Sequence, residues 1–480
     1  MLSSPLAKRP FEPNELEQIH GASMRLLQEH GVVIDSEKVL AFFKKHGVKV
    51  TGSKVFITEQ QILKAAETAP AQFEIRARNP EKNLQIGGGT PVLCGTGGGV
   101  YIAEKDKTQR LGTLEDYQKI AKLVQTSPLN QMTANECVTP SDVDAKIRHL
   151  DMMWHDLTLC DVAATSIAQN PDTVMDSLEM LSIIFGGYEK LKERPSTIGI
   201  ISPLSPLQYA PDEAEALMVL AEHRQPAAIT NMLLLGSTAP VYIPGALAIG
   251  NAELLAGVVL SQLVSPGTPA IYGSTSCPLY MKNGASCLGT PETLILSKGL
   301  VQLAKLYGLP SRTGGALSDA HLPDGQAMAE SVLCLNNAIE SGADYIYHAF
   351  GMLSSYLATS LEKWLIDEEM CRYILASKQR IEVNPKTLAI DTLLAMGAKG
   401  QYLTHPSTFE NFRSLYQSGF GNRDAYAVWM QKGGMDAADQ AGELIEKRLA
   451  AYQKPPMDSG LEQELKEWIR RRKQKIADES

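Results

Sequence analysis

The chain has 480 residues, of which 44% are hydrophobic, 21% are charged and 6% are aromatic, and its formal net charge is −9. The apolar fraction is sufficient for a packed core and excludes a mainly disordered chain. The acidic balance argues against a nucleic-acid binder, which needs a basic face. The seven cysteines are scattered singly and do not indicate a disulfide framework.

The N-terminal residues contain no apolar signal segment, and the apolar stretch 246–264 is interrupted by polar residues and glycine. We therefore expect a cytoplasmic protein without a membrane span.

The first 110 residues predict a small α+β extension. Apolar spacing predicts helices over 14–30 and 59–68, the first ending at Gly31. Between them, 48–50 and 55–57 flank a turn and predict a β-hairpin. Two glycine clusters then delimit short strands at 90–94 and 100–103.

Residues 111–380 alternate short apolar runs with amphipathic segments. The expected strands are 131–135, 157–164, 198–201, 227–232, 269–272, 311–316 and 344–349. The expected helices are 114–126, 142–156, 171–185, 211–224, 246–264, 290–307, 324–341 and 361–373. This alternation predicts an α/β protein with a parallel sheet, and the number of units favours a (β/α)8 TIM barrel. The remaining strand is expected at 391–396 or near 91–94.

Residues 381–480 are expected to form a helical C-terminal region. Its last segment, 461–476, is amphipathic and carries the basic run Arg470–Lys473. A solvated helix face is the favoured interpretation, and a docking surface for an acidic partner is the alternative.

Standard catalytic motifs are missing from the sequence. There is no Walker A or GxSxG motif, GTGGGV has the wrong spacing for a dinucleotide site, and CxxC, HxxxH and HExxH do not occur. We therefore predict no metal site and no tightly bound cofactor.

Rings occur where the expected strands end. Tyr272, Tyr347, His348 and Phe350 occupy such positions, and Trp154 and His155 lie near a helix end. Aromatic faces with few ionisable groups suit a cation such as a quaternary ammonium. Packing in the core is the alternative for each ring.

Four segments resemble the trimethylamine methyltransferase superfamily: TLEDYQKIAKLVQ (113–125), AELLAGVVLSQLVSPGTPAIYGS (252–274), LPSRTGGALSDAHLPDGQAMAES (309–331) and SGADYIYHAFGMLSSYLATSLEKWLIDEEM (341–370). The resemblance extends over about residues 14–450. It implies a barrel that transfers a methyl group from a methylated amine to the cobalt of a separate corrinoid protein, and it implies a homo-oligomer.

The loop 314–319 reads GGALSD, whereas founding members of that superfamily carry pyrrolysine there. The chain is therefore more similar to the pyrrolysine-free branch, which acts on quaternary amines. Glycine betaine is the first choice of substrate, followed by proline betaine or carnitine. The alternatives are a betaine-binding barrel without catalysis and a zinc-dependent corrinoid methyltransferase of the methanol or methylthiol type.

Methyl transfer from a quaternary ammonium needs orientation rather than a proton donor, so we expect no acid–base catalytic residue. The expected substrate contacts are of three kinds. The proposed cation cage is Tyr101, Trp154, Tyr272, Tyr347 and Phe350, with His155 and His348 as polar neighbours. Arg312, or the amides of Gly97–Gly99, would bind a carboxylate, and Asp319 would contact the ammonium. The alternative for Arg312 is a structural arginine that is paired within the barrel.

Overall fold

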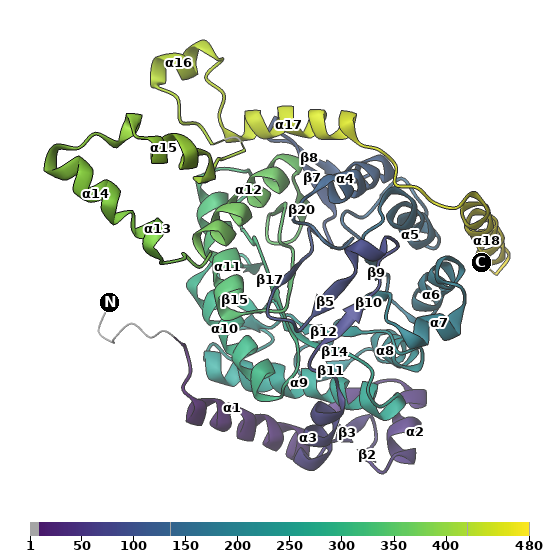
Figure 1. The fold of residues 1–480 in the computed structure, drawn as a ribbon. Helices are drawn as coiled ribbons and strands as arrows, with labels where there is room; N and C mark the ends of the chain where they lie inside the picture. Colours follow the sequence, from purple (N-terminus) through teal and green to yellow (C-terminus); the bar gives the residue numbers. More distant parts are fainter. Residues whose placement is uncertain (1–8, 135, 420, 480) are drawn as a thin grey trace.

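A computed structural model describes residues 9–134, 136–419 and 421–479 (Figure 1). The N-terminal part forms a small α+β layer on one side of the body. Its elements are α1 (Pro13–Arg25), the π-helical turn η1 (Leu26–His30), β1 (Val32–Ile34), α2 (Glu37–Lys45), β2 (Lys49–Thr51), β3 (Lys54–Phe56) and α3 (Glu59–Thr68). The predicted hairpin is confirmed, because β2 and β3 pair antiparallel.

The body is built on a parallel sheet of seven strands in the order β6-β18-β17-β14-β12-β10-β9. In chain order these are β6 (Val92–Leu93), β9 (Ala164–Ser166), β10 (Thr197–Ile201), β12 (Ala227–Asn231), β14 (Ala270–Ser274), β17 (Ser311–Gly314) and β18 (Tyr345–Tyr347). Single parallel bridges join Met132 to Cys94 and to Ala163, next to the two edge strands. The edges of the sheet therefore meet through Met132, and the body resembles a TIM barrel.

Helices alternate with these strands and cover the outside of the sheet (Figure 1). They are α4 (Leu114–Thr126), α5 (Arg148–Leu159), α6 (Pro171–Phe185), α7 (Tyr188–Glu193), α8 (Pro211–Glu222), α9 (Ile243–Val264), α10 (Pro291–Leu306), α11 (Gly325–Ser341) and α12 (Leu361–Ser377). The sequence shows the starts of several of them. Thr113 and Asn170 form capping boxes with α4 and α6, and Gly342 ends α11 in the left-handed conformation.

The structure corrects one expected strand, locates the missing strand and reduces a third expected strand to a single bridge. The run 157–164 was wrong as a strand, because its first residues end α5, where Leu157 packs with Leu150 and Met153 on one helical face. The sequence predicts the remaining strand of the barrel at 391–396 or near 91–94. It lies near 91–94, because β6 pairs with β18, whereas 391–396 is helical. The run 131–135 contributes Met132 alone as a bridge, and residue 135 lies outside the described part of the chain.

Helix α9 is long and apolar enough to cross a membrane by length and composition. In the structure, however, 78% of that window is buried. It contacts α1, α3, α8 and α10 and covers strands β12 and β14. Its apolar surface is therefore the core surface of the helical layer.

The two ends of the barrel carry different additions. At the amino ends of the strands, the hairpin of β4 (Phe73–Ile75) and β5 (Leu84–Ile86) is held by hydrogen bonds from Arg76 to Pro195 and from Asn79 to Asp161. The short turn η2 (Pro80–Lys82) follows β4. At the carboxyl ends lie the short strands β7 (Tyr101–Ala103), β8 (Gln109–Leu111), β11 (Gln208–Tyr209), β13 (Leu234–Leu235), β15 (Cys277–Tyr280), β16 (Ala285–Ser286), β19 (Met352–Leu353) and β20 (Ala358–Thr359).

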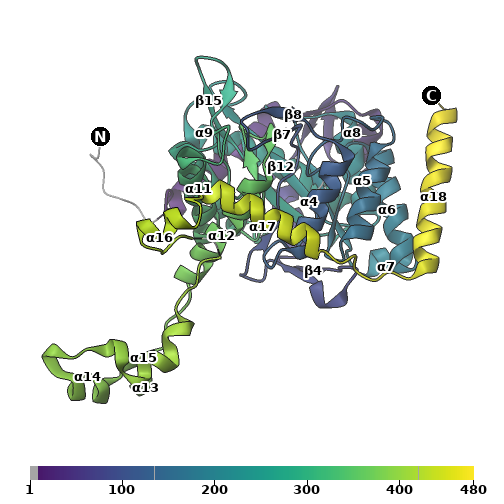
Figure 2. The same cartoon turned by 90° about the horizontal axis from the view of Figure 1, so that it is seen from above.

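Residues 381–415, which we call the arm, extend away from the body on the side where β4 lies (Figure 2). They contain α13 (Pro385–Leu388), α14 (Ile390–Met396), the turns η3 (Gly397–Lys399) and η4 (Tyr402–Thr404), α15 (Pro406–Asn411) and the turn η5 (Phe412–Ser414). The chain then returns through α16 (Tyr426–Gln431) to α17 (Ala437–Ala451), which packs on α4 and α12. No residue of the arm is buried.

The last helix, α18 (Ser459–Asp478), packs on α6. Its basic run has partners within the chain: Arg472 donates to Asp176 at 2.7 Å, and Lys473 donates to Asp151 at 2.5 Å. Arg470 and Arg471 pair with Glu467 of the same helix. Half of the basic run therefore fastens α18 to the barrel helices, a role that neither sequence interpretation included.

Candidate active site

A cavity of about 610 Å³ opens at the carboxyl ends of the barrel strands. Each strand of the parallel sheet contributes to the wall, either directly or through the loop that follows it. The segment after Met132 contributes as well. The lining residues are Gly97, Gly98, Glu136, Ala168, Gln169, Ile200, Ser202, Pro203, Leu204, Ser205, Glu213, Thr230, Asn231, Met232, Thr238, Thr275, Arg312, Tyr347, His348 and Tyr356. This end of a barrel is where substrates bind in enzymes of this architecture, so the cavity is the candidate site.

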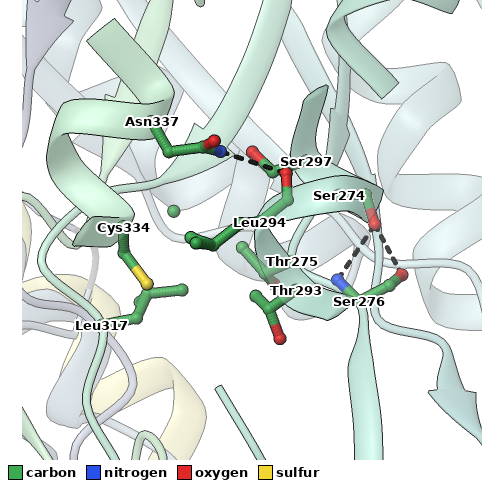
Figure 3. A pocket seen from close by; sticks show the side chains of 10 residues that line it. Ser274, Thr275, Ser276, Thr293, Leu294, Ser297, Leu317, Cys334 and Asn337 are labelled. Atoms are coloured by element: carbon green, nitrogen blue, oxygen red, sulfur yellow. Dashed lines mark hydrogen bonds between the residues drawn. The ribbon is translucent and has the colours of Figure 1, made fainter. Parts of the chain in front are cut away.

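A second cavity, of about 20 Å³, lies beside the first and shares Thr275 with it (Figure 3). Its walls include Leu317 and Cys334, and Asn337 donates to the carbonyl oxygen of Leu294 at its edge. A space of this size holds about one water molecule. It is too small for an organic substrate.

Arg312 is the most buried charged residue that lines the large cavity. It lies on β17 opposite Gly273 of β14, and the missing side chain there leaves room for it. Arg312 is 2% exposed, and its Nε and Nη1 atoms have no hydrogen-bond partner among the described residues. Burial lowers the pKa of Arg312 from its ordinary value. A buried guanidinium without an acid partner is costly, and a bound anion would offset that cost.

Three rings, in edge-on and tilted contacts, cluster next to Arg312. Its guanidinium carbon lies 5.1 Å from the ring centre of Tyr347. His348 lies between Tyr347 and Tyr356, with ring centres 4.4 Å and 4.6 Å apart. The side chain of Arg312 is therefore held between the strand and an aromatic wall.

His348 is neutral in this environment. Burial and the nearby charge of Arg312 hold its pKa well below the ordinary value. Its Nε2 lies 3.1 Å from the carbonyl oxygen of Gly97, which can only accept, so Nε2 carries the proton. Nδ1 is then a bare acceptor, and it has no hydrogen-bond partner in the described structure.

Three residues of the wall have left-handed backbone conformations although they are not glycine. They are Glu136 (φ 50°), His348 (φ 57°) and Tyr356 (φ 78°). Such conformations cost on the order of 1 kcal/mol each and persist where the surrounding structure fixes them. Their concentration in one cavity supports a functional role for this wall.

Of the nine predicted contacts, the cavity brings together Arg312, Tyr347 and His348. Tyr272 points to the opposite side of its strand: its hydroxyl donates to Asn251 of α9, because Gly273 and not Tyr272 faces the interior. Phe350 is buried against Trp364 of α12, with ring centres 5.7 Å apart. Neither ring lines the cavity.

The other predicted contacts lie elsewhere. Trp154 packs in the outer helical layer, and His155 contacts Gln118 of α4, where burial lowers its pKa to about 4. Tyr101 lies on β7, where it packs beside Leu353 of β19 and Ala358 of β20, and it does not line the cavity.

Asp319 has a structural environment in the loop after β17. Its carboxylate accepts from the amides of Leu288 and Gly289 and from the hydroxyl of Ser355. Glu330 holds the same loop by accepting from Ser318 and from the amide of Asp319. These carboxylates join neighbouring loops rather than line the cavity.

The glycine amides expected to bind an anion are partly occupied. The amide of Gly98 donates to the carbonyl oxygen of Glu136 at 2.8 Å. Gly97 and Gly98 line the cavity through their backbone.

Sequence reasoning missed Tyr356, Glu136 and Glu213, which also line the cavity. Glu136 follows the expected strand 131–135 and so stands at a predicted strand end, but it is not among the predicted substrate contacts. Tyr356 and Glu213 lie in a loop and at the start of α8, so no strand pattern points to them. Elsewhere, the described residues contain no group of three or more His, Cys, Asp or Glu side chains that could hold a metal ion.

The sequence matches the family model described as trimethylamine methyltransferase (MTTB) over residues 4–477. It is 33% identical to a glycine betaine methyltransferase of Desulfitobacterium hafniense, with 97% of each chain covered. It is 30% identical to a proline betaine:corrinoid methyltransferase of Eubacterium limosum, with 92% of this chain and 93% of that protein covered.

The fold is similar to that of the monomethylamine methyltransferase of Methanosarcina barkeri, with a TM-score of 0.54 and 12% sequence identity. The match covers 92% of this chain and 89% of the other. At this identity the likeness concerns the fold alone.

Proposed function

The chain belongs to the trimethylamine methyltransferase family, and we propose that it transfers a methyl group from a betaine to the Co(I) of a cognate corrinoid protein. Glycine betaine is the first candidate, and proline betaine and carnitine follow. The carrying observation is Arg312, a buried guanidinium that faces the cavity and has no acid partner among residues 9–134, 136–419 and 421–479. A betaine carboxylate would supply the missing anion. Simple methylated amines have no such group.

The relatives support a quaternary amine as the methyl donor. Two of them are named for glycine betaine and proline betaine, and a third is named L-carnitine:corrinoid methyltransferase, at 29% identity. All three donors combine a trimethyl- or dimethylammonium group with a carboxylate. The carboxylate that all three donors share could form the ion pair that Arg312 lacks in the described chain.

The loop after β17 also favours the pyrrolysine-free branch of the family, which acts on quaternary amines. Residues 314–319 are standard amino acids, and none of them lines the large cavity. The carbonyl oxygen of Ala316 accepts from Lys363, and Leu317 is buried. The loop is thus part of the packed wall and leaves substrate recognition to Arg312 and its neighbours.

The reduced corrinoid, when docked, supplies the nucleophile for in-line attack on a methyl carbon. The chain itself would hold the substrate carboxylate, orient one methyl toward the mouth and exclude water from the reacting centre. The amine leaves as a neutral tertiary amine, so no side chain has to deliver a proton. A neutral His348, and an Arg312 that has no ion-pair partner in the described part of the chain, are consistent with a positioning mechanism.

We further propose that the segment at Met132 counts as the eighth strand, which makes the body a (β/α)8 barrel. The additions before and after it would be the α+β and helical extensions. Because β6 belongs to the parallel sheet, we place the start of the barrel near residue 92 rather than at residue 111. We place the protein in the cytoplasm, where its seven free cysteines would stay reduced.

We also propose a homo-oligomer, and the arm supports it. Its exposed apolar side chains are Ile381, Val383, Leu388, Ile390, Leu393, Leu394, Tyr402, Leu403, Phe409, Phe412 and Leu415. Residues 381–415 carry three basic and three acidic residues, so charge does not favour an acidic or a basic partner. The corrinoid protein has to dock at the cavity, at the other end of the barrel, so the arm is available to a permanent partner such as a second copy of this chain.

The test is a methyl-transfer assay. Purified protein is mixed with a reduced corrinoid partner and with glycine betaine, proline betaine or carnitine, and the absorbance of the corrinoid is followed. We expect methylation with at least one of the three. The corrinoid partner should be one that a related enzyme can methylate. If its absorbance then changes with no quaternary amine, a betaine-binding barrel without catalysis is favoured. Stoichiometric zinc in the purified protein would favour the methanol or methylthiol type.

The role of Arg312 has its own test. Arg312→Gln removes the charge, and we expect betaine KM to rise by about 10- to 100-fold, the range for a lost hydrogen bond to a charged group. Arg312→Lys should recover part of the affinity but not the forked geometry. Tyr272→Phe is the matched control, because its hydroxyl faces α9. An unchanged KM in Arg312→Gln would contradict the assignment.

A further inference from the structure

Two carboxylates lie in the wall of the cavity away from Arg312. Glu136 follows the Met132 segment, and Glu213 lies in the first turn of α8 after β10. With the sheet edges joined through Met132, both segments are three strand positions from β17, in opposite directions around the barrel. The negative groups therefore face the positive group across the mouth.

These carboxylates have no close ion-pair partner in the described chain, although the charge of Arg148 acts on Glu136 from a longer distance and favours its ionised form. Within residues 9–134, 136–419 and 421–479, neither forms an ion pair within 4.0 Å. The Oε2 atom of Glu213 is buried and has no hydrogen-bond partner. Glu136 accepts from Gln169 at 2.6 Å, and burial raises its pKa. A buried carboxylate oxygen without a partner is costly unless a cation or a donor occupies the space in front of it.

The rings of the cavity are poorly placed to bind a second cation. Tyr347, His348 and Tyr356 form one cluster of rings, and Arg312 lies over the ring of Tyr347. An ammonium ion against that cluster would be next to the guanidinium of Arg312, and the two positive charges would repel each other at low dielectric constant. The aromatic side of the cavity thus fits the carboxylate end of a betaine.

We propose that the cavity binds a zwitterion in one orientation, with its carboxylate on Arg312 and its ammonium toward Glu136 and Glu213. The two acidic residues, rather than an aromatic cage, select the positive charge of the substrate. This inference rests on the proposed betaine substrate and adds the groups that recognise its cationic end. Charge–charge attraction falls only with the inverse of distance, so a short betaine need not touch both carboxylates.

The reaction itself predicts how these residues act. As the C–N bond breaks, its electron pair stays on nitrogen, the methyl carbon bonds to the incoming nucleophile, and the positive charge on nitrogen disappears. A carboxylate near nitrogen therefore stabilises bound substrate more than the transition state. Loss of that carboxylate should raise KM and leave kcat equal or higher.

The binding test compares three probes by calorimetry. Glycine betaine carries both charges. The 3,3-dimethylbutanoate ion has the same shape with carbon in place of nitrogen, and choline has the ammonium without a carboxylate. For Glu213→Gln and Glu136→Gln we expect about tenfold weaker binding of glycine betaine and choline, equivalent to the loss of one favourable charge interaction. Binding of 3,3-dimethylbutanoate should be unchanged or tighter.

Asp212→Asn is the matched control, because Asp212 lies in the same first turn of α8 but is exposed and outside the cavity. It should bind all three probes as the wild type does. The kinetic test uses the betaine that the transfer assay identifies, and we expect the KM effect without a fall in kcat. Thermal melting of each variant checks that it is folded.

The outcomes separate the two proposals. If Glu213→Gln and Glu136→Gln weaken the binding of 3,3-dimethylbutanoate as much as that of glycine betaine, the acidic residues do not recognise the cation. The same conclusion follows if these variants lower kcat and leave KM unchanged. If they change nothing while Arg312→Gln weakens both carboxylate probes, the betaine function stands and this inference is wrong. If the wild type binds none of the probes and methylates no corrinoid with a quaternary amine, the proposed function itself fails.

Discussion

At the scale of single residues, the alternation of side chains along each strand decides the site. Tyr272 and Gly273 are neighbours in sequence, yet Tyr272 faces α9 and Gly273 faces the interior next to Arg312. The sequence identified Arg312, Tyr347 and His348, because strand ends of a barrel carry its chemistry. It could not separate them from Tyr272 and Phe350, because an error of one residue in register exchanges the two faces of a strand.

Phe350 provides a test of this distinction. Phe350→Ala should lower the free energy of unfolding by about 3–5 kcal/mol, because it leaves a cavity beside Trp364. Phe350→Leu should cost less and leave betaine KM unchanged. Tyr347→Leu should instead raise KM, because the ring of Tyr347 supports Arg312 in the cavity wall. Chemical denaturation and steady-state kinetics give the two quantities, and a raised KM in Phe350→Leu would return that ring to the substrate site.

At the scale of elements, buried polar groups fasten the loops of the mouth to the helices behind them. Glu253 of α9 accepts from Ser205, from the amide of Leu207 and from Asn231. It thereby holds the loop after β10 and the end of β12, which both line the cavity. On the other side, Lys363 and Asp367 of α12 form a fully buried pair. Lys363 also donates to Ala316, and Asp367 accepts from the amide of Gly351.

Glu253 gives the protein a defined pH response. Burial raises the pKa of Glu253 to about 7, whereas the pKa of a glutamate in the unfolded chain is near its ordinary value of 4.5. Between about pH 4.5 and 7 the folded state therefore binds the extra proton, and the stabilisation from Glu253 is lost as pH rises through this window. The loss is about 3 kcal/mol.

The check is the free energy of unfolding of wild type and Glu253→Gln across that window. The difference between them should change with pH, because the variant has no titrating group at this position. A constant difference from pH 4.5 to 7 would mean that Glu253 does not bind the extra proton. Other buried acids affect both proteins equally and do not enter the comparison.

The pair in α12 predicts a different pattern. Lys363→Met alone should destabilise the fold by about 3–5 kcal/mol, because it leaves Asp367 buried without its cation. Replacement of both, Lys363→Met with Asp367→Leu, should recover part of this loss. Lys447→Met is the control, since its partner Glu443 and Lys447 itself are exposed on α17, and it should change stability by less than about 1 kcal/mol. Additive effects of the two replacements at positions 363 and 367 would contradict the proposed coupling.

At the scale of the whole molecule, the two ends of the barrel differ in what they expose. The carboxyl ends of the strands carry the cavity, and the arm leaves the end of α12 on the side of the β4–β5 hairpin (Figure 2). The arm has capped helices, such as α13 behind Asn384, but it has no buried residue. Short helices without tertiary packing are marginal in water, so contact with another chain would stabilise them.

If the arm is the interface between copies of the chain, substitutions of its exposed apolar side chains should break up the homo-oligomer. Leu394 and Leu403 are 76% and 81% exposed. Replacing both with Glu, together with Phe409→Glu, should lower the mass measured by sedimentation or light scattering to that of a smaller species. Methyl transfer should persist, because the cavity is at the other end. Lys447→Glu, at an exposed position of α17, is the control and should leave the mass unchanged.

If the triple variant keeps the wild-type mass, the arm is not the interface between copies. If the mass is unchanged but transfer to the corrinoid protein is lost, the arm contacts that partner instead. Either result would overturn the assignment of the arm to a second copy of the chain.

The sequence by itself determined the alternation of strands and helices, the starts of helices at residues such as Thr113 and Asn170, and the family. These are local properties, because caps and apolar periods act within a few residues. It also placed Arg312 among the candidate substrate contacts. The tertiary structure decided what a side chain meets after it leaves its element: Tyr272 meets α9, Phe350 meets Trp364, and Lys473 of α18 meets Asp151.

The same holds for the charges of the cavity. Glu136 and Glu213 lie 77 positions apart in the chain and are brought to one wall by the closing of the sheet. Whether a charge has a partner depends on segments that are distant in sequence, and no local pattern records it. Only the fold shows that Arg312, Glu136 and Glu213 share one cavity without pairing with another charged side chain of the described chain.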